Sequence, residues 1–212
     1  MRKTRGTNGG ARRDDIIAKA AHLMQEKGYG GISVQEIADA LNFSKANFFY
    51  HLRSKQNLLH AIFVEPLKFT IGRLEEIVQR EDSGEARLRA IVDLYVHLVV
   101  ERAAEMQVWF KEKGHLSPAH RAEVTRLERR VGALLEGFFS AGVARGEFRD
   151  IDPFVAMNAI VAMCFSLTRW PQLQKRFSRQ ELSEQMQQLA CGALLVGGRA
   201  RRPAARARRR LG

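Results

Sequence analysis

The sequence predicts an all-α protein, with a small N-terminal three-helix domain and a larger helical domain, about nine helices together. Apolar residues recur with helical spacing along most of the chain, and no stretch alternates with the two-residue period of a strand. Serine or aspartate precedes many of these runs, and glycine or proline separates them, as at helix ends. With 212 residues, the chain suits one large domain or two small ones.

The first helices of the chain are short and closely spaced. A helix is predicted over residues 12–27, and Ser33 then precedes an apolar run as an N-cap residue does. After a break at residues 42–43, Ser44 can cap a second short helix, residues 45–52. Two short helices joined by a tight turn predict a helix-turn-helix, whose second helix lies in the DNA major groove. A polar surface hairpin is the alternative on spacing alone.

Residues 37–58 carry a longer pattern, with IA, then FSKANFFYHL, then SKQNL. With the helix before it, this stretch resembles the DNA-binding domain of TetR-type transcriptional repressors. It departs from the family's pattern at three positions. Asn42 replaces the turn glycine but tolerates a left-handed backbone. Ala46 replaces a glycine and favours the helix, and Phe49 replaces a phosphate-binding tyrosine and has no hydroxyl.

The resemblance implies that this domain binds a double-stranded DNA operator. The residues we expect to contact DNA are Ser33, Ser44, Lys45, Asn47, Tyr50, His51 and Lys55. Lys45 and Asn47 should read base edges, while the other five should mainly hold phosphate oxygens.

The net charge of +12 is confined to the two ends of the chain. Residues 1–13 hold five basic and no acidic groups, residues 199–212 hold seven arginines, and residues 14–198 are neutral. We expect 1–13 to be a basic disordered arm that contacts DNA. For the Arg-rich disordered tail, 199–212, DNA contact and a merely solubilising role are equally open. The DNA-binding domain is then 14–60 and the helical body 61–198.

Further helices are predicted in the body. Lys55 opens a fourth helix, in which Pro66 predicts a kink or a break. A shorter apolar segment covers residues 106–114. The other helix starts follow a glycine break or a capping residue: Gly84, Ser117–Pro118, Asp152–Pro153, and Ser178 with Glu181.

The helix after Asp152 is apolar almost all round, so it must be covered on several sides. With the last helix, it resembles the pair that forms the dimer interface in TetR-type proteins. The resemblance therefore implies a homodimer on a near-palindromic operator. The alternative is a purely intramolecular core.

The resemblance, and not the periodicity, implies that the body binds a small-molecule effector. The candidate cavity residues are Leu94, Tyr95, Leu98, Trp109, Phe110, Leu134, Leu135, Phe138, Met157 and Phe165. Singly, each of them is more often plain core.

Residues 108–153 resemble a branch of the family whose members are released from DNA by acyl-CoA thioesters. Four arginines on the predicted helix there could meet the phosphates of such a ligand: Arg121, Arg126, Arg129 and Arg130. Solvated arginines paired with Glu123 and Glu128 are the alternative.

No motif indicates catalysis, a metal site or a cofactor, so we expect no enzyme. Cys164 and Cys191 suit small core residues in a reducing cytoplasm. No apolar run reaches 18 residues, so we expect neither a membrane span nor membrane binding. The remaining alternative is an interaction module that meets DNA only through its basic ends.

Overall fold

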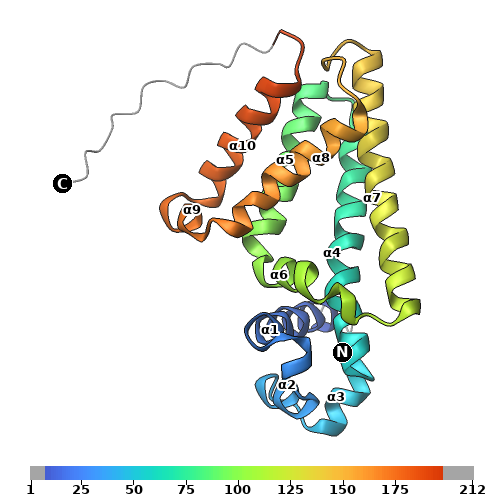
Figure 1. The fold of residues 1–212 in the computed structure, drawn as a ribbon, viewed down its shortest axis with the longest axis vertical. Helices are drawn as coiled ribbons and strands as arrows, with labels where there is room; N and C mark the ends of the chain where they lie inside the picture. Colours follow the sequence, from blue (N-terminus) through green and yellow to red (C-terminus); the bar gives the residue numbers. More distant parts are fainter. Residues whose placement is uncertain (1–7, 198–212) are drawn as a thin grey trace, which may run out of the picture.

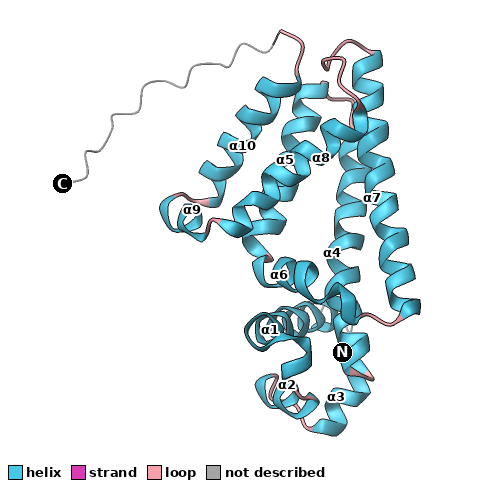
Figure 2. Cartoon of the chain, in the orientation of Figure 1, coloured by secondary structure: helices cyan, strands magenta, loops and turns pink. Residues whose placement is uncertain are grey.

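The computed structural model describes residues 8–197, which form ten α-helices and two short 3₁₀ helices and contain no strand (Figure 2). The helices are α1 (Asn8–Gly31), α2 (Val34–Ala40), α3 (Lys45–Leu52), α4 (Lys55–Val78), α5 (Gly84–Glu101), α6 (Ala103–Glu112), η1 (Lys113–His115), α7 (Pro118–Ala144), α8 (Pro153–Phe165), η2 (Ser166–Arg169), α9 (Pro171–Arg176) and α10 (Arg179–Leu194). The predicted all-α class is confirmed.

The helices form two parts that share α4 (Figure 1). At one end, α1, α2 and α3 surround the start of α4. From there α4 runs beside α7 into the body, where α5, α8 and α10 pack, while α6 lies between α1 and the rest. None of the described helices is long and apolar enough to cross a membrane.

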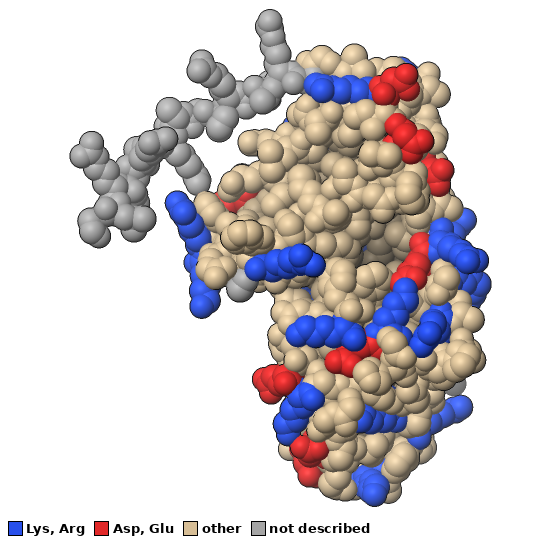
Figure 3. All heavy atoms as spheres, viewed as in Figure 1, with Lys and Arg blue, Asp and Glu red and all other residues tan. Residues whose placement is uncertain are grey.

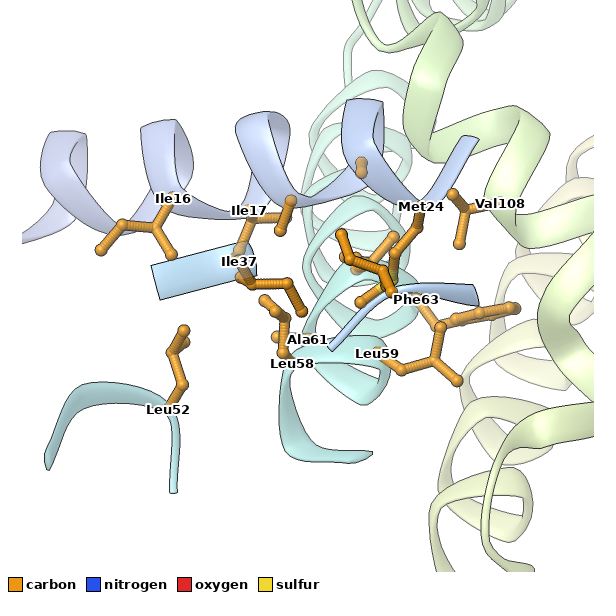
Figure 4. Packing of buried hydrophobic residues seen from close by; sticks show 14 of the residues in the cluster. Ile16, Ile17, Met24, Ile37, Leu52, Leu58, Leu59, Ala61, Phe63 and Val108 are labelled. Carbon is orange, nitrogen blue, oxygen red and sulfur yellow. The ribbon is translucent and has the colours of Figure 1, made fainter. Parts of the chain in front are cut away.

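Two hydrophobic cores correspond to these parts. In the first, Ile17 and Met24 of α1 point toward Leu58 and Leu59 of α4, and Val108 of α6 closes the same interior (Figure 4). Leu116 and Val124 also belong to this core. The N-terminal part, α1 to α3 with the start of α4, is the end that the sequence predicts to bind DNA and is called the DNA-binding end below. Its core reaches across residue 60, where the sequence placed a domain boundary.

The N-terminal helix is longer than predicted. It begins at Asn8, so residues 8–13 are helical and the predicted disordered arm of residues 1–13 is corrected for that part. A helix anchored by its buried apolar turns extends at little further cost, which explains the extra residues. Residues 1–7 and 198–212, with the rest of the arm and the whole basic tail, lie outside the described residues.

Two glycine-like backbone positions behave as the sequence predicts. Gly28 has φ 72°, which ends the regular part of α1, and Asn42 has φ 54° in the turn between α2 and α3. An asparagine tolerates this left-handed conformation better than most residues do.

Two prolines bear on the helices of the body, and at Pro66 the predicted alternative of a break is excluded. The helix α4 continues through Pro66 to Val78 without a break, and the Thr70 hydroxyl donates to the Pro66 carbonyl at 2.8 Å. The helix that starts after Asp152 ends at Phe165, and η2 and the short helix α9 follow it. Trp170 is non-helical because it precedes a proline.

Candidate DNA-binding face and ligand cavity

The helix-turn-helix is set by its N-caps, both as predicted. The Ser33 hydroxyl accepts from the Glu36 backbone at 3.1 Å, and the Glu36 carboxylate accepts from the Ser33 backbone at 2.8 Å. The Ser44 hydroxyl accepts from the Asn47 backbone at 3.1 Å. Each cap satisfies backbone donors that the first turn leaves open, so both short helices begin at a defined residue.

The Glu36 carboxylate lies on the helix-turn-helix, and its negative charge is offset by Lys27. Lys27 Nζ lies 2.6 Å from Glu36 Oε1. The hydrogen bond from Lys27, followed by those from Ser33, lowers the pKa of Glu36 to about 2. Glu36 is therefore ionised at neutral pH, and its neighbour Lys27 limits the repulsion that it would exert on DNA phosphates.

Most of the predicted DNA contacts lie at the surface of α2 and α3. Ser33, Ser44, Lys45 and His51 are exposed, and Tyr50 is 81% exposed. The His51 ring lies 5.0 Å from Tyr50 and 5.6 Å from Phe43, centroid to centroid. Asn47 is half-buried. The geometry leaves these side chains available on one helix-turn-helix, and their contact with DNA stays a prediction.

Lys55 is placed differently from the other candidates. Its ammonium donates to the Ile32 carbonyl and lies 4.4 Å from the centre of the Tyr29 ring. These partners lie more than twenty residues away in the sequence, so spacing gave no sign of them. The structure thus gives Lys55 an internal role beside the phosphate contact that the sequence predicts.

Gln56 joins the DNA-binding end to the body. Its side-chain nitrogen donates to the Tyr29 hydroxyl at 2.9 Å and to the His115 carbonyl at 2.7 Å. Its oxygen accepts from the Ser117 backbone at 3.2 Å. Beside this contact, the rings of His60 and His120 stack at 4.2 Å, and burial lowers the pKa of His120. The start of α4 is therefore tied directly to η1 and to the start of α7.

A cavity of about 360 Å³ lies in the body between α4, α5, α6, α7 and α8. Six of the ten predicted residues line it: Tyr95, Leu98, Trp109, Leu135, Met157 and Phe165. Its lining is mainly apolar, and its size is within the range of ligand pockets.

The other four predicted residues do not line this cavity. Leu94 and Phe138 are buried in the body core and Leu134 packs against it. Phe110 is 54% exposed and lines a neighbouring surface groove of about 890 Å³ that also contains Lys111 and Arg169. Helical periodicity marks all of these residues as inward-facing alike, so it does not separate core from cavity.

Further lining residues were not predicted, above all the side of α4: Phe63, Pro66, Leu67 and Thr70. Their apolar pattern is that of any buried helix, and only the interrupting Pro66 set this segment apart. The cavity also contains an ion pair, in which Lys113 Nζ lies 2.6 Å and 2.7 Å from the two Glu128 carboxylate oxygens.

The four predicted anion-binding arginines of α7 divide into two groups. Arg121, Arg126 and Arg129 line one surface groove of about 540 Å³. Arg130 lies outside that groove and its guanidinium is 2.9 Å from the Glu75 carboxylate. The structure therefore brings three of the four together.

The surface over α8 and α10 carries few charged side chains (Figure 3). Phe154 and Val155 of α8 are 60% and 56% exposed, and Leu189 of α10 is 59% exposed. Large apolar side chains left exposed on helices that pack together are candidates for an interaction surface. The apolar composition of α8 requires it to be covered on several sides, but within one chain part of its surface stays exposed.

Two family models match the chain. The model described as bacterial regulatory proteins, tetR family, matches residues 16–62. The model described as tetracyclin repressor-like, C-terminal domain, matches residues 81–194, more than half of the chain. Between them they cover both parts of the fold.

Individual proteins are also similar. The HTH-type transcriptional repressor KstR2 of Rhodococcus jostii is 28% identical over 169 residues, covering 79% of this chain and 82% of the relative. The regulator PfmR of Thermus thermophilus has a TM-score of 0.76 at 28% identity, covering 84% of this chain and 97% of that one. The structure of AibR in complex with isovaleryl coenzyme A and operator DNA has a TM-score of 0.71 at 27% identity, with the same coverage.

Proposed function

The chain belongs to the TetR family of bacterial regulatory proteins, and from this premise we propose that it is a dimeric repressor that acyl-CoA thioesters release from its operator. Its place among DNA-binding transcriptional regulators follows from the family. The dimer, the operator contacts and the effector are the proposal. The observation that carries it is a ligand-sized cavity bordered by α4, the helix that also begins in the DNA-binding core.

The DNA-reading role rests on α3. Lys45 and Asn47 read bases, and Ser33, Ser44, Tyr50 and His51 hold phosphates; Lys55 does so only if its ammonium leaves Ile32. The supporting observation is that these groups are presented by two capped helices with a defined turn.

The proposed dimer forms through the last two long helices. Exposed Phe154 and Val155 of α8 and Leu189 of α10 supply the apolar surface, and two-fold pairing covers it in both chains. Leu189→Glu should give a monomer by light scattering and weaken operator binding, because one helix-turn-helix then acts alone. The neighbouring Gln188→Glu adds the same charge to α10 and should stay dimeric. Dimerisation of the Leu189→Glu protein would contradict this interface.

The effector class rests on the cavity and on the groove of three arginines. The cavity accepts an apolar acyl group, and Arg121, Arg126 and Arg129 on the same helix α7 offer guanidinium groups to phosphates. The printed ligand of the similar protein AibR, isovaleryl coenzyme A, supports this class.

Release of DNA would start at two contacts between cavity and DNA-binding end. Phe63 is fully buried in the first core and also lines the cavity, 6.4 Å from Trp109 between ring centroids. Lys113 lies in η1, whose His115 carbonyl accepts from Gln56 at the start of α4. A ligand that moves either group changes the seating of α4, and with it the spacing of the two recognition helices.

Filling the cavity tests the effector proposal. Gly132 of α7 lines the cavity and has open space where a side chain would start, so Gly132→Phe should fill it. Octanoyl-CoA should then bind about tenfold more weakly or not at all in a calorimetric titration. Gly137→Phe is the matched control, since Gly137 also has open space but is exposed on the same helix. Equal binding by both variants would place the ligand elsewhere.

The arginines are tested by comparing ligands. Arg126→Ala with Arg129→Ala should weaken octanoyl-CoA but not octanoate, because only the thioester carries phosphates. Arg130→Ala is the comparison, since its guanidinium is paired with Glu75 outside the groove. Loss of octanoate binding in the double variant would indicate a structural defect and contradict the phosphate role.

A further inference from the structure

The cavity has one buried polar group that the protein does not use. Tyr95 of α5 lines the cavity and is only 4% exposed. Its ring meets Phe165 edge-on at 6.1 Å between centroids. Within residues 8–197, no hydrogen bond is made by its hydroxyl, although a buried hydroxyl without a partner costs free energy.

The hydroxyl nevertheless has space beside it. The hydroxyl oxygen is not fully enclosed by the described residues, so a small group can reach it. Tyr95 belongs to the body core and borders the cavity, so the cavity is the open space from which a ligand could approach it. Burial raises the pKa of Tyr95, which keeps the hydroxyl protonated and able to donate.

Four other polar side chains of the cavity are already engaged, those of Thr70, Asn158, Lys113 and Glu128. The Thr70 hydroxyl donates to the Pro66 carbonyl at 2.8 Å, and the Asn158 amide donates to the Phe154 carbonyl at 2.7 Å. Lys113 is paired with Glu128. Beside the half-buried indole N–H of Trp109, the Tyr95 hydroxyl is therefore the donor that a ligand can use without first breaking a contact among the described residues.

We infer that Tyr95 is a specificity-determining residue that donates a hydrogen bond to an oxygen on the apolar part of the ligand. The inference rests on the proposed function and names the effector more closely: an acyl chain that carries a keto or similar acceptor oxygen within the cavity, rather than a plain hydrocarbon chain. A site that offers a buried hydrogen bond discriminates strongly against an analogue that leaves it unmade.

A pair of matched ligands tests this. Octanoyl-CoA and 7-oxooctanoyl-CoA differ by one keto oxygen near the inner end of the chain. The unsubstituted protein should bind the keto ligand about tenfold more tightly, and Tyr95→Phe should bring the two affinities together by weakening the keto ligand alone. Tyr50→Phe removes a hydroxyl far from the cavity lining and should keep the tenfold ratio.

Four results would overturn the inference. The ratio could be absent in the unsubstituted protein, or unchanged in Tyr95→Phe, while octanoyl-CoA still binds; the proposed function then stands without this contact. If neither thioester binds the unsubstituted protein, the effector class itself fails and this inference falls with it. The midpoint of urea unfolding without ligand is a second readout. It should not fall in Tyr95→Phe, and a clear fall would show that the hydroxyl serves the fold instead.

Discussion

The DNA-binding end of the molecule is densely packed, whereas the body is hollow beside the same helix α4. Phe48, Leu58 and Leu59 are fully buried in the first core. A few turns along α4, Pro66 and Thr70 border a cavity of about 360 Å³. The difference indicates a division of labour: a rigid core holds α3 in one position, while the open space in the body lets a ligand alter how that rigid unit is seated.

The largest expected difference between the two regions concerns stability. Leu58→Ala removes a side chain enclosed in the dense core and should cost about 3–5 kcal/mol of unfolding free energy. Leu98→Ala truncates a side chain that already borders the cavity, so it should cost only about 2 kcal/mol. Urea unfolding at one protein concentration measures both. Equal losses would mean that the cavity is filled in solution and would contradict the comparison.

The next expected effect is on base reading. Asn47→Ala should weaken operator binding by about 1–3 kcal/mol and relax the preference at one position in each half-site. A panel of operator variants, measured by fluorescence anisotropy, checks both effects. Octanoyl-CoA affinity should be unchanged because Asn47 is on α3, which contributes no residue to the cavity lining. Uniform weakening across all operator variants would rule out base reading by Asn47.

The two lysines of the helix-turn-helix should respond differently to salt. Lys45→Ala should lower the slope of log affinity against log salt by about one unit, since Lys45 is an exposed cation at the start of α3 that would offset phosphate charge as well as read a base edge. Lys55→Ala should lower it by less, because its ammonium donates to Ile32 inside the protein. A full unit for Lys55→Ala would instead support the phosphate contact that the sequence predicts.

The smallest expected effect is the loss of stability when the serine of a capping box is replaced, and each region has one such box. Ser33 with Glu36 caps α2, and Ser178 with Glu181 caps α10 in the same way. Replacing either serine by alanine should cost about 1 kcal/mol of stability. Only Ser33→Ala should also weaken operator binding, because of the two serines only Ser33 is proposed to contact DNA. An equal loss of operator affinity in Ser178→Ala would remove Ser33 from the phosphate contacts.

The two regions also differ in how far sequence reasoning reaches. The caps at Ser33 and Ser44 and the left-handed turn at Asn42 depend on residues within four positions, so local patterns predict them. The Lys55 ammonium donates to the Ile32 carbonyl, and no local sequence pattern predicts this contact.

The cavity depends on packing between helices that are far apart in sequence. Tyr95 and Leu94 are neighbours on α5 with similar burial, yet only Tyr95 borders the cavity. Periodicity identifies an inward-facing side chain, but whether it meets another side chain or open space is decided by the neighbouring helices. For the same reason Phe63 and Thr70 of α4 were missed.

A ligand bound in the body is expected to control DNA binding at the other end of the molecule. An operator selected from random duplexes by the full-length protein, labelled and bound at fixed salt, permits a direct test by fluorescence anisotropy. Added octanoyl-CoA should release the operator from the unsubstituted protein and from Gly137→Phe, while Gly132→Phe, with its cavity filled, should stay bound. If octanoyl-CoA released the operator from all three proteins to the same extent, or from none of them, control of DNA binding by a ligand in the cavity would be contradicted.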